Sequence, residues 1–330
     1  MRLVLAVPDL LAHDRGALAS LSSLARLAQF SNAPVVRQGA LDDFLVTPAR
    51  SATAALAALG AGYDPGAKYV LRADPVSLVA GRNDVVLSAH IDDLDAVDTA
   101  ALLATLNAHF SGDRLAFHAP RPDAWFVESE TAPDFRTTPL PAVRGAIYPH
   151  LPTGNDGPQW RRWLSEMQML LHEHPANAVR AAHGRVPVTG IWISGGGRLT
   201  DIAPTQGART FATKGPAGDV ARGLAERNGI FVSEPPLDFS ALQTEVSAIV
   251  VLSPAARMNV GDLDRDWLAP AVRALEHGAL DGLTLLADGL GVAASWHAER
   301  PAWSRRISAQ TRALLAPRPF VPPAPEGDDA

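Results

Sequence analysis

Two acidic residues follow apolar runs that have the length of buried strands. Asp9 comes after the first apolar run of the chain, and Asp288 ends the run Leu283–Ala287. Acids at the carboxyl ends of parallel strands point into the crevice in which open α/β sheets bind ligands. Together with His297, and with Ser51 at the predicted start of a helix, they could hold a divalent metal beside a nucleophile. Taken singly, either acid is more typical of a cap or a turn.

Glycine and arginine residues form a second candidate site, for an anion. Gly195, Gly196 and Gly197 follow a predicted strand, where backbone N–H groups can approach an anion, although a tight turn explains the glycines equally well. The other candidate ligand-binding residues are Arg72, Arg162, Asn177 and Arg180. Guanidinium groups suit phosphate and carboxylate, so the expected partner is an anionic or phosphorylated metabolite. A surface ion pair remains the alternative for each arginine, because Arg replaces Lys almost throughout the chain.

The elements that would position these residues alternate between strands and helices. The apolar runs Val188–Ile193, Ala248–Leu252 and Leu283–Ala287 have strand length, and segments with a helical pattern lie at Gly218–Asn228 and Trp267–His277. This rhythm is typical of βα units. We therefore expect an α/β fold with a mostly parallel sheet flanked by helices.

A smaller α+β domain is expected within this fold. Residues 1–69 and 153–316 would form the α/β core, and residues 70–152 would form the inserted domain. Eight prolines between Pro120 and Pro158 indicate a loop or a crossing between domains. Residues 317–330 carry five prolines and an acidic end, and we expect a disordered tail there.

Composition narrows the classes of function. Hydrophobic residues make up 47% of the 330 residues, which is enough for a full core. A net charge of -6 leaves no basic surplus for a phosphate backbone, so nucleic acid is not an expected partner. The absence of cysteine excludes disulfides, zinc-thiolate sites and cysteine nucleophiles. No apolar run reaches the length of a membrane span, so we expect a cytoplasmic protein without a membrane partner.

Several segments, in the same order, resemble the archaeal-type cofactor-independent phosphoglycerate mutases of the alkaline phosphatase superfamily. The most specific are His174-Pro-Ala-Asn-Ala-Val-Arg180 and Ile191-Trp-Ile-Ser-Gly-Gly-Gly197, which are similar to the family's His-Pro-x-Asn-x-x-Arg and Ile-Trp-x-x-Gly-x-Gly. The segments Ser51–Gly60, Tyr63–Pro65 and Leu71–Ile91 resemble further family stretches. The branch that the chain resembles most is the bacterial RpfE-type regulatory proteins. The resemblance implies an alkaline-phosphatase-like sheet.

The resemblance also implies roles for single residues. Family members hold two Mn²⁺ or Zn²⁺ ions with Asp and His side chains, and a serine takes up the phosphoryl group before returning it. Asp9 matches the metal ligand of the first strand, Asp288 the acid of an Asp-His pair, and His297 the last histidine ligand. Ser51 matches the nucleophile.

Four positions depart from the family pattern. The resemblance places family metal ligands or their neighbours at Ala52, Ala255, Asn259 and Gly289. Alanine and glycine side chains cannot bind a metal, and a two-metal displacement needs both ions. The sequence therefore predicts no metal cofactor or, at most, Mn or Zn at one partial site.

These departures favour a protein that has lost catalysis. The leading hypothesis is a phosphoglycerate-mutase-like protein with a degenerate metal site that serves as a regulatory or ligand-sensing protein. The competing hypothesis is a one-metal phosphohydrolase, or a residual mutase, that uses Ser51 with Asp9 and Asp288. A third hypothesis is a scaffold that recruits a protein partner through the inserted domain or the tail.

Overall fold

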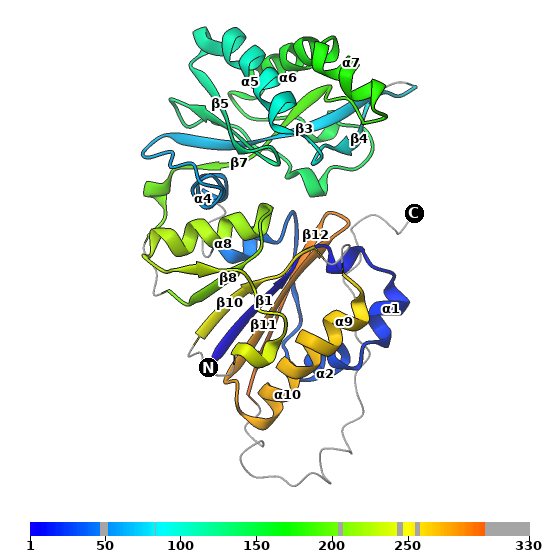
Figure 1. Cartoon of the computed structure of the whole chain (residues 1–330), viewed down its shortest axis with the longest axis vertical. Coiled ribbons are helices and arrows are strands. Elements are labelled where there is room, and N and C mark those ends of the chain that lie inside the picture. The colour runs from blue at the N-terminus through cyan, green and yellow to red at the C-terminus, as the bar shows by residue number, and fades with distance from the viewer. Residues whose placement is uncertain (47–51, 83, 204–206, 243–246, 255–257, 301–330) are drawn as a thin grey trace. The chain divides into compact units, whose positions relative to one another are not determined.

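The chain folds into two compact units (Figure 1). The computed structural model describes residues 1–46, 52–82, 84–203, 207–242, 247–254 and 258–300. Unit 1 comprises Met1–Leu45 and Thr205–Ala330, and unit 2 comprises Val46–Pro204. These boundaries differ from the predicted ones at residues 69/70 and 152/153. The predicted tail, residues 317–330, lies outside the described residues.

Unit 1 is built on a seven-stranded sheet in the order β2-β12-β11-β1-β10-β8-β9. The central strand β1 pairs in parallel with both β10 and β11, and β8 and β9 continue the parallel part. Strand β12 pairs antiparallel with both β11 and β2, so among the described strands of this sheet it is the one that runs opposite to the others. The predicted mostly parallel sheet is therefore present. The strands are β1 (Arg2–Val7), β2 (Val35–Gln38), β8 (Arg209–Ala212), β9 (Val232–Ser233), β10 (Ser247–Val251), β11 (Gly282–Gly289) and β12 (Val292–Glu299).

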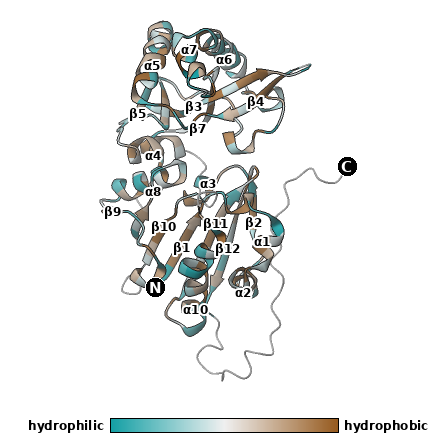
Figure 2. Ribbon diagram, turned by 45° about the vertical axis from the view of Figure 1, so that its right-hand side comes forward, coloured by the Kyte–Doolittle hydropathy of each residue, from teal (hydrophilic) through white to brown (hydrophobic). Residues whose placement is uncertain are grey.

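Helices cover both faces of this sheet. The side chains of β1 alternate between the two faces, so each face has an apolar core. Leu3, Leu5 and Val7 belong to a large cluster that includes residues of α2 and α10, whereas Ala6 packs in a second cluster with residues of α8. Figure 2 shows the strands of this unit mostly in brown, the hydrophobic colour. The helices are α1 (Arg15–Ser20), α2 (Ser22–Phe30), α3 (Asp42–Leu45), α8 (Pro216–Arg227), α9 (Val260–Leu263) and α10 (Ala269–His277).

Unit 2 contains a five-stranded antiparallel sheet. Its long strand β3 pairs with β4, β6 and β7, and β6 also pairs with β5. The run Val188–Ile193 was expected to form a parallel strand of the core, but its strand β7 pairs antiparallel with β3. This pairing places the run in unit 2. The strands are β3 (Tyr69–Ala80), β4 (Val85–His90), β5 (Leu115–Arg121), β6 (Ala124–Ser129) and β7 (Gly190–Gly197).

Three helices, α5, α6 and α7, lie on one face of this second sheet (Figure 1). Their apolar residues form one core with those of the strands, including Leu102, Phe110, Trp125 and Trp160. The fourth helix, α4, contacts β3 and β7. The helices are α4 (Thr53–Gly60), α5 (Ala96–Phe110), α6 (Gly157–His172) and α7 (Pro175–Ala182).

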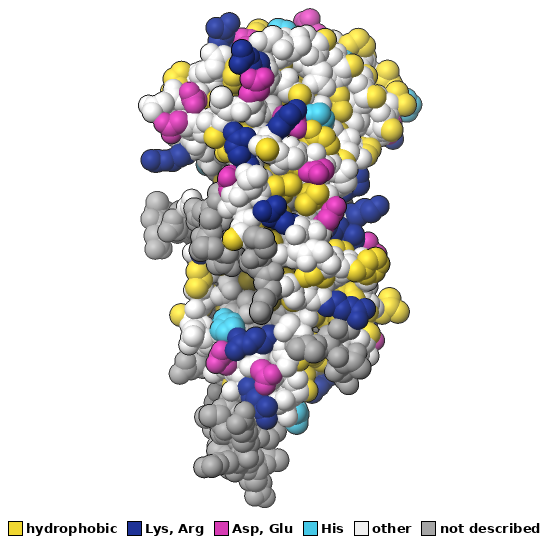
Figure 3. All heavy atoms as spheres, turned by 90° about the vertical axis from the view of Figure 1, so that its left-hand side faces the viewer, with side chains coloured by type: hydrophobic (Ala, Val, Ile, Leu, Met, Phe, Trp, Pro, Cys, Tyr) yellow, Lys and Arg dark blue, Asp and Glu magenta, His cyan; other side chains and the backbone are white. Residues whose placement is uncertain are grey.

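Acidic and basic side chains are intermixed on the face of the molecule that Figure 3 draws. Within the described ranges, no helix combines the length and the apolar character that crossing a membrane requires.

Candidate functional site

The structure brings Asp9 and Asp288 together. Their strands, β1 and β11, are parallel neighbours in register, so that both acids emerge at the same edge of the sheet. The backbone N–H of Asp9 donates to Asp288 Oδ1 at 2.8 Å, and that of Leu41 donates to Oδ2 at 2.9 Å. Asp288 thus ties three separate segments of unit 1 together.

Asp288 lies in an acidic and largely buried environment. Burial and, to a smaller extent, the carboxylates of Asp9 and Asp42 raise the pKa of Asp288, whereas the amide hydrogen bonds from Asp9 and Leu41 lower it. The net result is a pKa of about 6. Asp42, the first residue of α3, is itself buried. An additional proton or cation at this edge would relieve the repulsion among the three acids.

His297 does not join the two acids. On β12 it lies opposite Thr284, whereas Asp288 lies opposite Ala293. Four residues of strand separate the two positions, or about 13 Å at the usual rise per residue. The His297 ring instead bonds to Thr284 Oγ1 through Nδ1 at 2.8 Å, and its side chain is 45% exposed.

Steric constraints explain why residue 289 is glycine. Its φ is 152°, and a Cβ there would lie 2.6 Å from the carbonyl carbon of Leu11 and closer still to Ala12 N. The end of β11 is therefore packed against the backbone of the turn Leu10–Ala12, and no side chain fits. Asn259 is likewise engaged, because its side chain accepts the N–H of Gly261 and caps α9. Ala255 lies outside the described residues.

The described residues do not fit a two-metal centre. Across the ranges that the structure describes, no group of three or more His, Asp or Glu side chains is arranged to hold a metal ion. Both carboxylate oxygens of Asp288 accept backbone N–H groups. Gly289, at the position where the family resemblance expects a histidine ligand, has no side chain. Ser51 lies outside the described residues.

The three glycines of β7 pack against the start of α4. The N–H of Ala52 donates to the carbonyl oxygen of Gly196 at 2.6 Å, and a Cβ on Gly197 would lie 2.5 Å from that of Ala52. Helix α4 begins at Thr53, after Ala52 in the left-handed conformation. The close approach of two backbones explains why residue 197 is glycine, whereas a Cβ on Gly196 would collide with the Tyr69 side chain.

Asn177 stabilises the turn that connects α7 to β7. Its amide nitrogen donates to the carbonyl oxygens of Leu171 and Val188 at 2.7 and 2.8 Å, and its oxygen accepts the N–H of Val188 at 2.8 Å. His174 caps α7 through the N–H of Ala176. The polar groups of this motif are therefore engaged in holding the fold.

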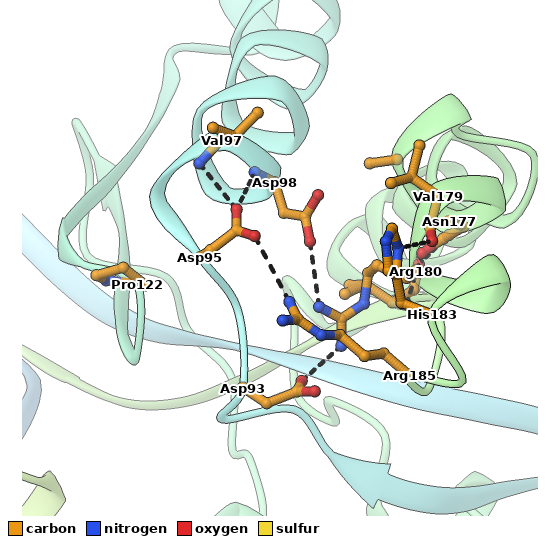
Figure 4. A network of polar contacts seen from close by, with 12 residues as sticks. Asp93, Asp95, Val97, Asp98, Pro122, Asn177, Val179, Arg180, His183 and Arg185 are labelled. Atoms are coloured by element: carbon orange, nitrogen blue, oxygen red, sulfur yellow. Dashed lines mark hydrogen bonds and ion pairs between the residues drawn. The ribbon is translucent and has the colours of Figure 1, made fainter.

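Arg180 of the same motif is fully buried in a network of acids (Figure 4). Its Nη2 lies 2.5 Å from Asp93 and its Nη1 lies 3.3 Å from Asp98, while Nε donates to the carbonyl oxygen of Val186 at 2.9 Å. At the edge of the network, Arg185 lies 3.5 Å from Asp95. Arg180 joins α7 to the segment that leads into α5.

The remaining predicted ligand residues are separate from this network. Arg72 on β3 lies opposite Ser194, next to the glycines, and pairs with Asp74 at 3.3 Å. Arg162 on α6 is 74% exposed and pairs with Glu166 at 2.9 Å. The predicted anion site is thus distributed between buried structural contacts and the surface of α6.

Unit 2 contains a cluster of four ionisable residues that no sequence pattern predicted. Glu128 on β6, almost fully buried, accepts hydrogen bonds from the Tyr63 hydroxyl and from Lys68 Nζ, the latter at 2.5 Å. His118 on β5 stacks on the Tyr63 ring at 4.3 Å, and its Nε2 lies 3.2 Å from the Tyr63 hydroxyl. The sequence holds one indication of this cluster, namely that Lys68 is one of only two lysines in the chain.

The pKa values in this cluster follow from burial and from Glu128. Burial opposes ionisation of Glu128, but hydrogen bonds from Lys68 and Tyr63 outweigh it and lower the pKa of Glu128. Burial and Glu128 together raise the pKa of Tyr63. Burial lowers the pKa of His118, although Glu128 opposes this effect. The cluster therefore favours a carboxylate, a neutral phenol and a neutral imidazole at neutral pH.

Comparison with known proteins gives likenesses to solved structures only. No protein-family model matches the chain, and no curated protein matches it. It is similar to the cofactor-independent phosphoglycerate mutase of Thermoplasma acidophilum DSM 1728, with 15% identity and a TM-score of 0.36 over 96% of this chain and 95% of the mutase. It is also similar to a Pyrococcus horikoshii protein, with 14% identity and a TM-score of 0.42 over 90% and 87% of the two chains.

Proposed function

We propose that this chain is a phosphoglycerate-mutase-like protein of the RpfE type that has lost the metal site and serves as a regulatory or ligand-sensing protein. The observation that carries the proposal is the environment of Asp288. Both of its oxygens bind backbone N–H groups, and the adjacent Gly289 has no space for an imidazole. A residue that matches a metal ligand is here part of the structural framework.

The motif residues of unit 2 support the same proposal. Asn177 and Arg180, which match the most specific family motif, bind backbone carbonyls and buried acids. Such contacts maintain a scaffold independently of any reaction, so the motif could persist in a protein without catalysis. The anionic or phosphorylated metabolite expected from the sequence would then be a signal rather than a substrate.

One observation favours a second candidate, the one-metal phosphohydrolase. Asp9 and Asp42 lie near enough to Asp288 to raise its pKa, so a cation at this edge of the sheet of unit 1 would relieve their repulsion, although the three carboxylates of these described residues are not arranged as a metal site. This hydrolase would use Ser51 as its nucleophile. It predicts metal binding that depends on Asp9.

Metal content and turnover, measured on the same sample, separate the two candidates. The full chain is purified without chelator, incubated with Mn²⁺ or Zn²⁺, desalted and analysed for metal, and it is then assayed with 3-phosphoglycerate and with p-nitrophenyl phosphate. The regulatory proposal expects neither stoichiometric metal nor turnover. Stoichiometric metal that disappears in Asp9→Ala, with activity that disappears in Ser51→Ala, would replace it with the hydrolase. Glu226→Gln, an exposed acid on α8, is the matched control for Asp9→Ala.

A further inference from the structure

Unit 1 has a cavity of about 500 Å³ at the C-terminal end of α10, away from the edge of the sheet that carries Asp9 and Asp288. A volume of this size is typical of sites for small organic ligands. Apolar residues form most of its lining: Met1, Phe239, Pro270, Ala274, Ala279 and Leu280. Phe239 and Leu280 are buried, so that the floor of the cavity is apolar.

Two basic side chains, Arg273 and His277, complete the lining, and both are exposed. Within the part of the chain that the structure describes, the guanidinium of Arg273 forms no hydrogen bond or ion pair. The carbonyl oxygen of Arg273 bonds to His277 Nδ1 at 2.7 Å, which fixes the imidazole and leaves its Nε2 available. The mouth of the cavity therefore presents a cation that has no anion among the described residues to neutralise it.

Neighbouring groups do not compete for this cation. Glu276 is buried and pairs with Arg26 at 2.7 Å, and Asp281 pairs with the amine of Met1 at 2.7 Å. The carbonyl of Ala274, in the last turn of α10, accepts the N–H groups of Ala279 and Leu280 at 2.8 and 3.1 Å. Because these acceptors are satisfied within the fold, Arg273 is free to bind a ligand.

We infer that this cavity binds an organic anion with an apolar body, most simply a carboxylate attached to a short alkyl or aromatic group. The apolar body lies over Phe239 and Leu280, and the carboxylate accepts two hydrogen bonds from the fork of Arg273. The inference goes beyond the proposed function and is independent of it, because it concerns a different part of unit 1 and needs neither a metal nor Ser51.

The test compares two ligands of equal size and different charge. Binding of 4-phenylbutyrate and of neutral 4-phenyl-1-butanol to the full chain is measured by calorimetry. Saturable binding of the carboxylate at millimolar concentration or below is expected. Loss of the charge-assisted contact weakens the alcohol about tenfold relative to the carboxylate.

Three variants assign the site. Arg273→Gln is expected to reduce carboxylate affinity about tenfold and to leave the alcohol unchanged. Ala279→Trp fills the cavity and is expected to abolish binding of both ligands. Arg15→Gln, an exposed arginine on α1, is the matched control and is expected to bind like the parent protein. Circular dichroism shows which variants fold.

Specific outcomes would overturn the inference. They are the absence of saturable carboxylate binding, equal affinity for the alcohol and the carboxylate, or unchanged affinity in folded Arg273→Gln. None of them would alter the metal and turnover results that test the proposed function. Those results, in turn, leave this site unaffected.

Discussion

The carboxylate of Asp288 accepts the backbone N–H of Asp9 across 279 residues of sequence. Its second oxygen holds the N–H of Leu41, so one side chain joins the ends of β1 and β11 to the segment before α3. Two partly buried N–H groups depend on this acid, and each would lose its partner without it. The position that the family resemblance assigns to a metal ligand thus has a structural function of its own.

Asp288→Ala is expected to destabilise unit 1 by about 2–4 kcal/mol, because it leaves two N–H groups unsatisfied. The free energy of unfolding, measured by urea denaturation, checks this value. Glu226→Gln, which removes an exposed acid of α8, is the control and should stay within about 0.5 kcal/mol of the parent. An Asp288→Ala variant as stable as this control would show that the two hydrogen bonds contribute nothing.

The raised pKa of Asp288 predicts a pH dependence of stability. The folded pKa of about 6 lies above the unfolded value of about 4, so that the folded state binds more protons between these limits. The stabilisation is complete below about pH 4 and is lost as the pH rises through about 6. Partial solvent access limits the loss to about 2 kcal/mol.

Other carboxylates titrate in the same range, so the difference between parent and Asp288→Asn isolates this effect. The free energy of unfolding of the parent, relative to the variant, should decrease from about pH 4 to about pH 6.5, as measured by urea denaturation at several pH values. A constant difference would mean that the pKa of Asp288 is the same in the folded and unfolded states.

Gly289→Ala tests whether a side chain can be accommodated at the end of β11. The φ of 152° and the contact with Leu11 predict destabilisation of about 3 kcal/mol or more. Gly229→Ala is the matched control, because Gly229 also has a positive φ, 67°, but a methyl group added there would have open space around it. Its cost should be only the backbone term, about 1–2 kcal/mol. Equal thermal stabilities would contradict the steric explanation.

The sequence predicted the parts of the fold that local patterns determine. Continuous apolar runs at β1, β10 and β11 identify strands that are buried on both faces, and the parallel sheet follows from the helices between them. The strand β7 has the same apolar character, and nothing in its residues specifies whether it pairs with β10 or with β3. Pairing between distant segments depends on packing of the whole unit, and the bounds of the two units differ from those of the predicted domains for this reason.

The candidate site likewise has parts that the sequence predicts and parts that depend on the pairing of distant segments. Asp9 and Asp288 could be predicted at the same edge because each follows a strand of a parallel sheet, but the sequence does not show that the two strands are neighbours, which the pairing of β1 with β11 does. The position of His297 depends on the register of the hairpin that joins β11 to β12, which places it opposite Thr284. The Glu128 cluster was missed because its members come from separate segments, and only the pairing of β3, β5 and β6 brings them together.

Tyr63 and Lys68 are expected to stabilise the fold cooperatively through their common partner. Tyr63→Phe removes one donor from buried Glu128 and should cost about 1–2 kcal/mol, and Lys68→Met, at an exposed position, should cost about 1 kcal/mol or less. Because both bind one carboxylate, the double variant should differ from the sum of the single effects by about 0.5–1 kcal/mol. Strictly additive free energies of unfolding would exclude coupling through Glu128.

Arg180 and Arg185 provide a matched comparison within one acidic cluster (Figure 4). Arg180→Met leaves Asp98, whose side chain is 10% exposed, without its buried cation, and should destabilise unit 2 by about 3–5 kcal/mol. Arg185→Met removes a cation that is 44% exposed and should cost at most about 1 kcal/mol. Chemical denaturation of the two variants measures the difference. Similar costs would mean that burial of Arg180 does not determine its contribution to the free energy of unfolding. A ligand would then be required to explain why Arg180 occupies a position in the most specific family motif.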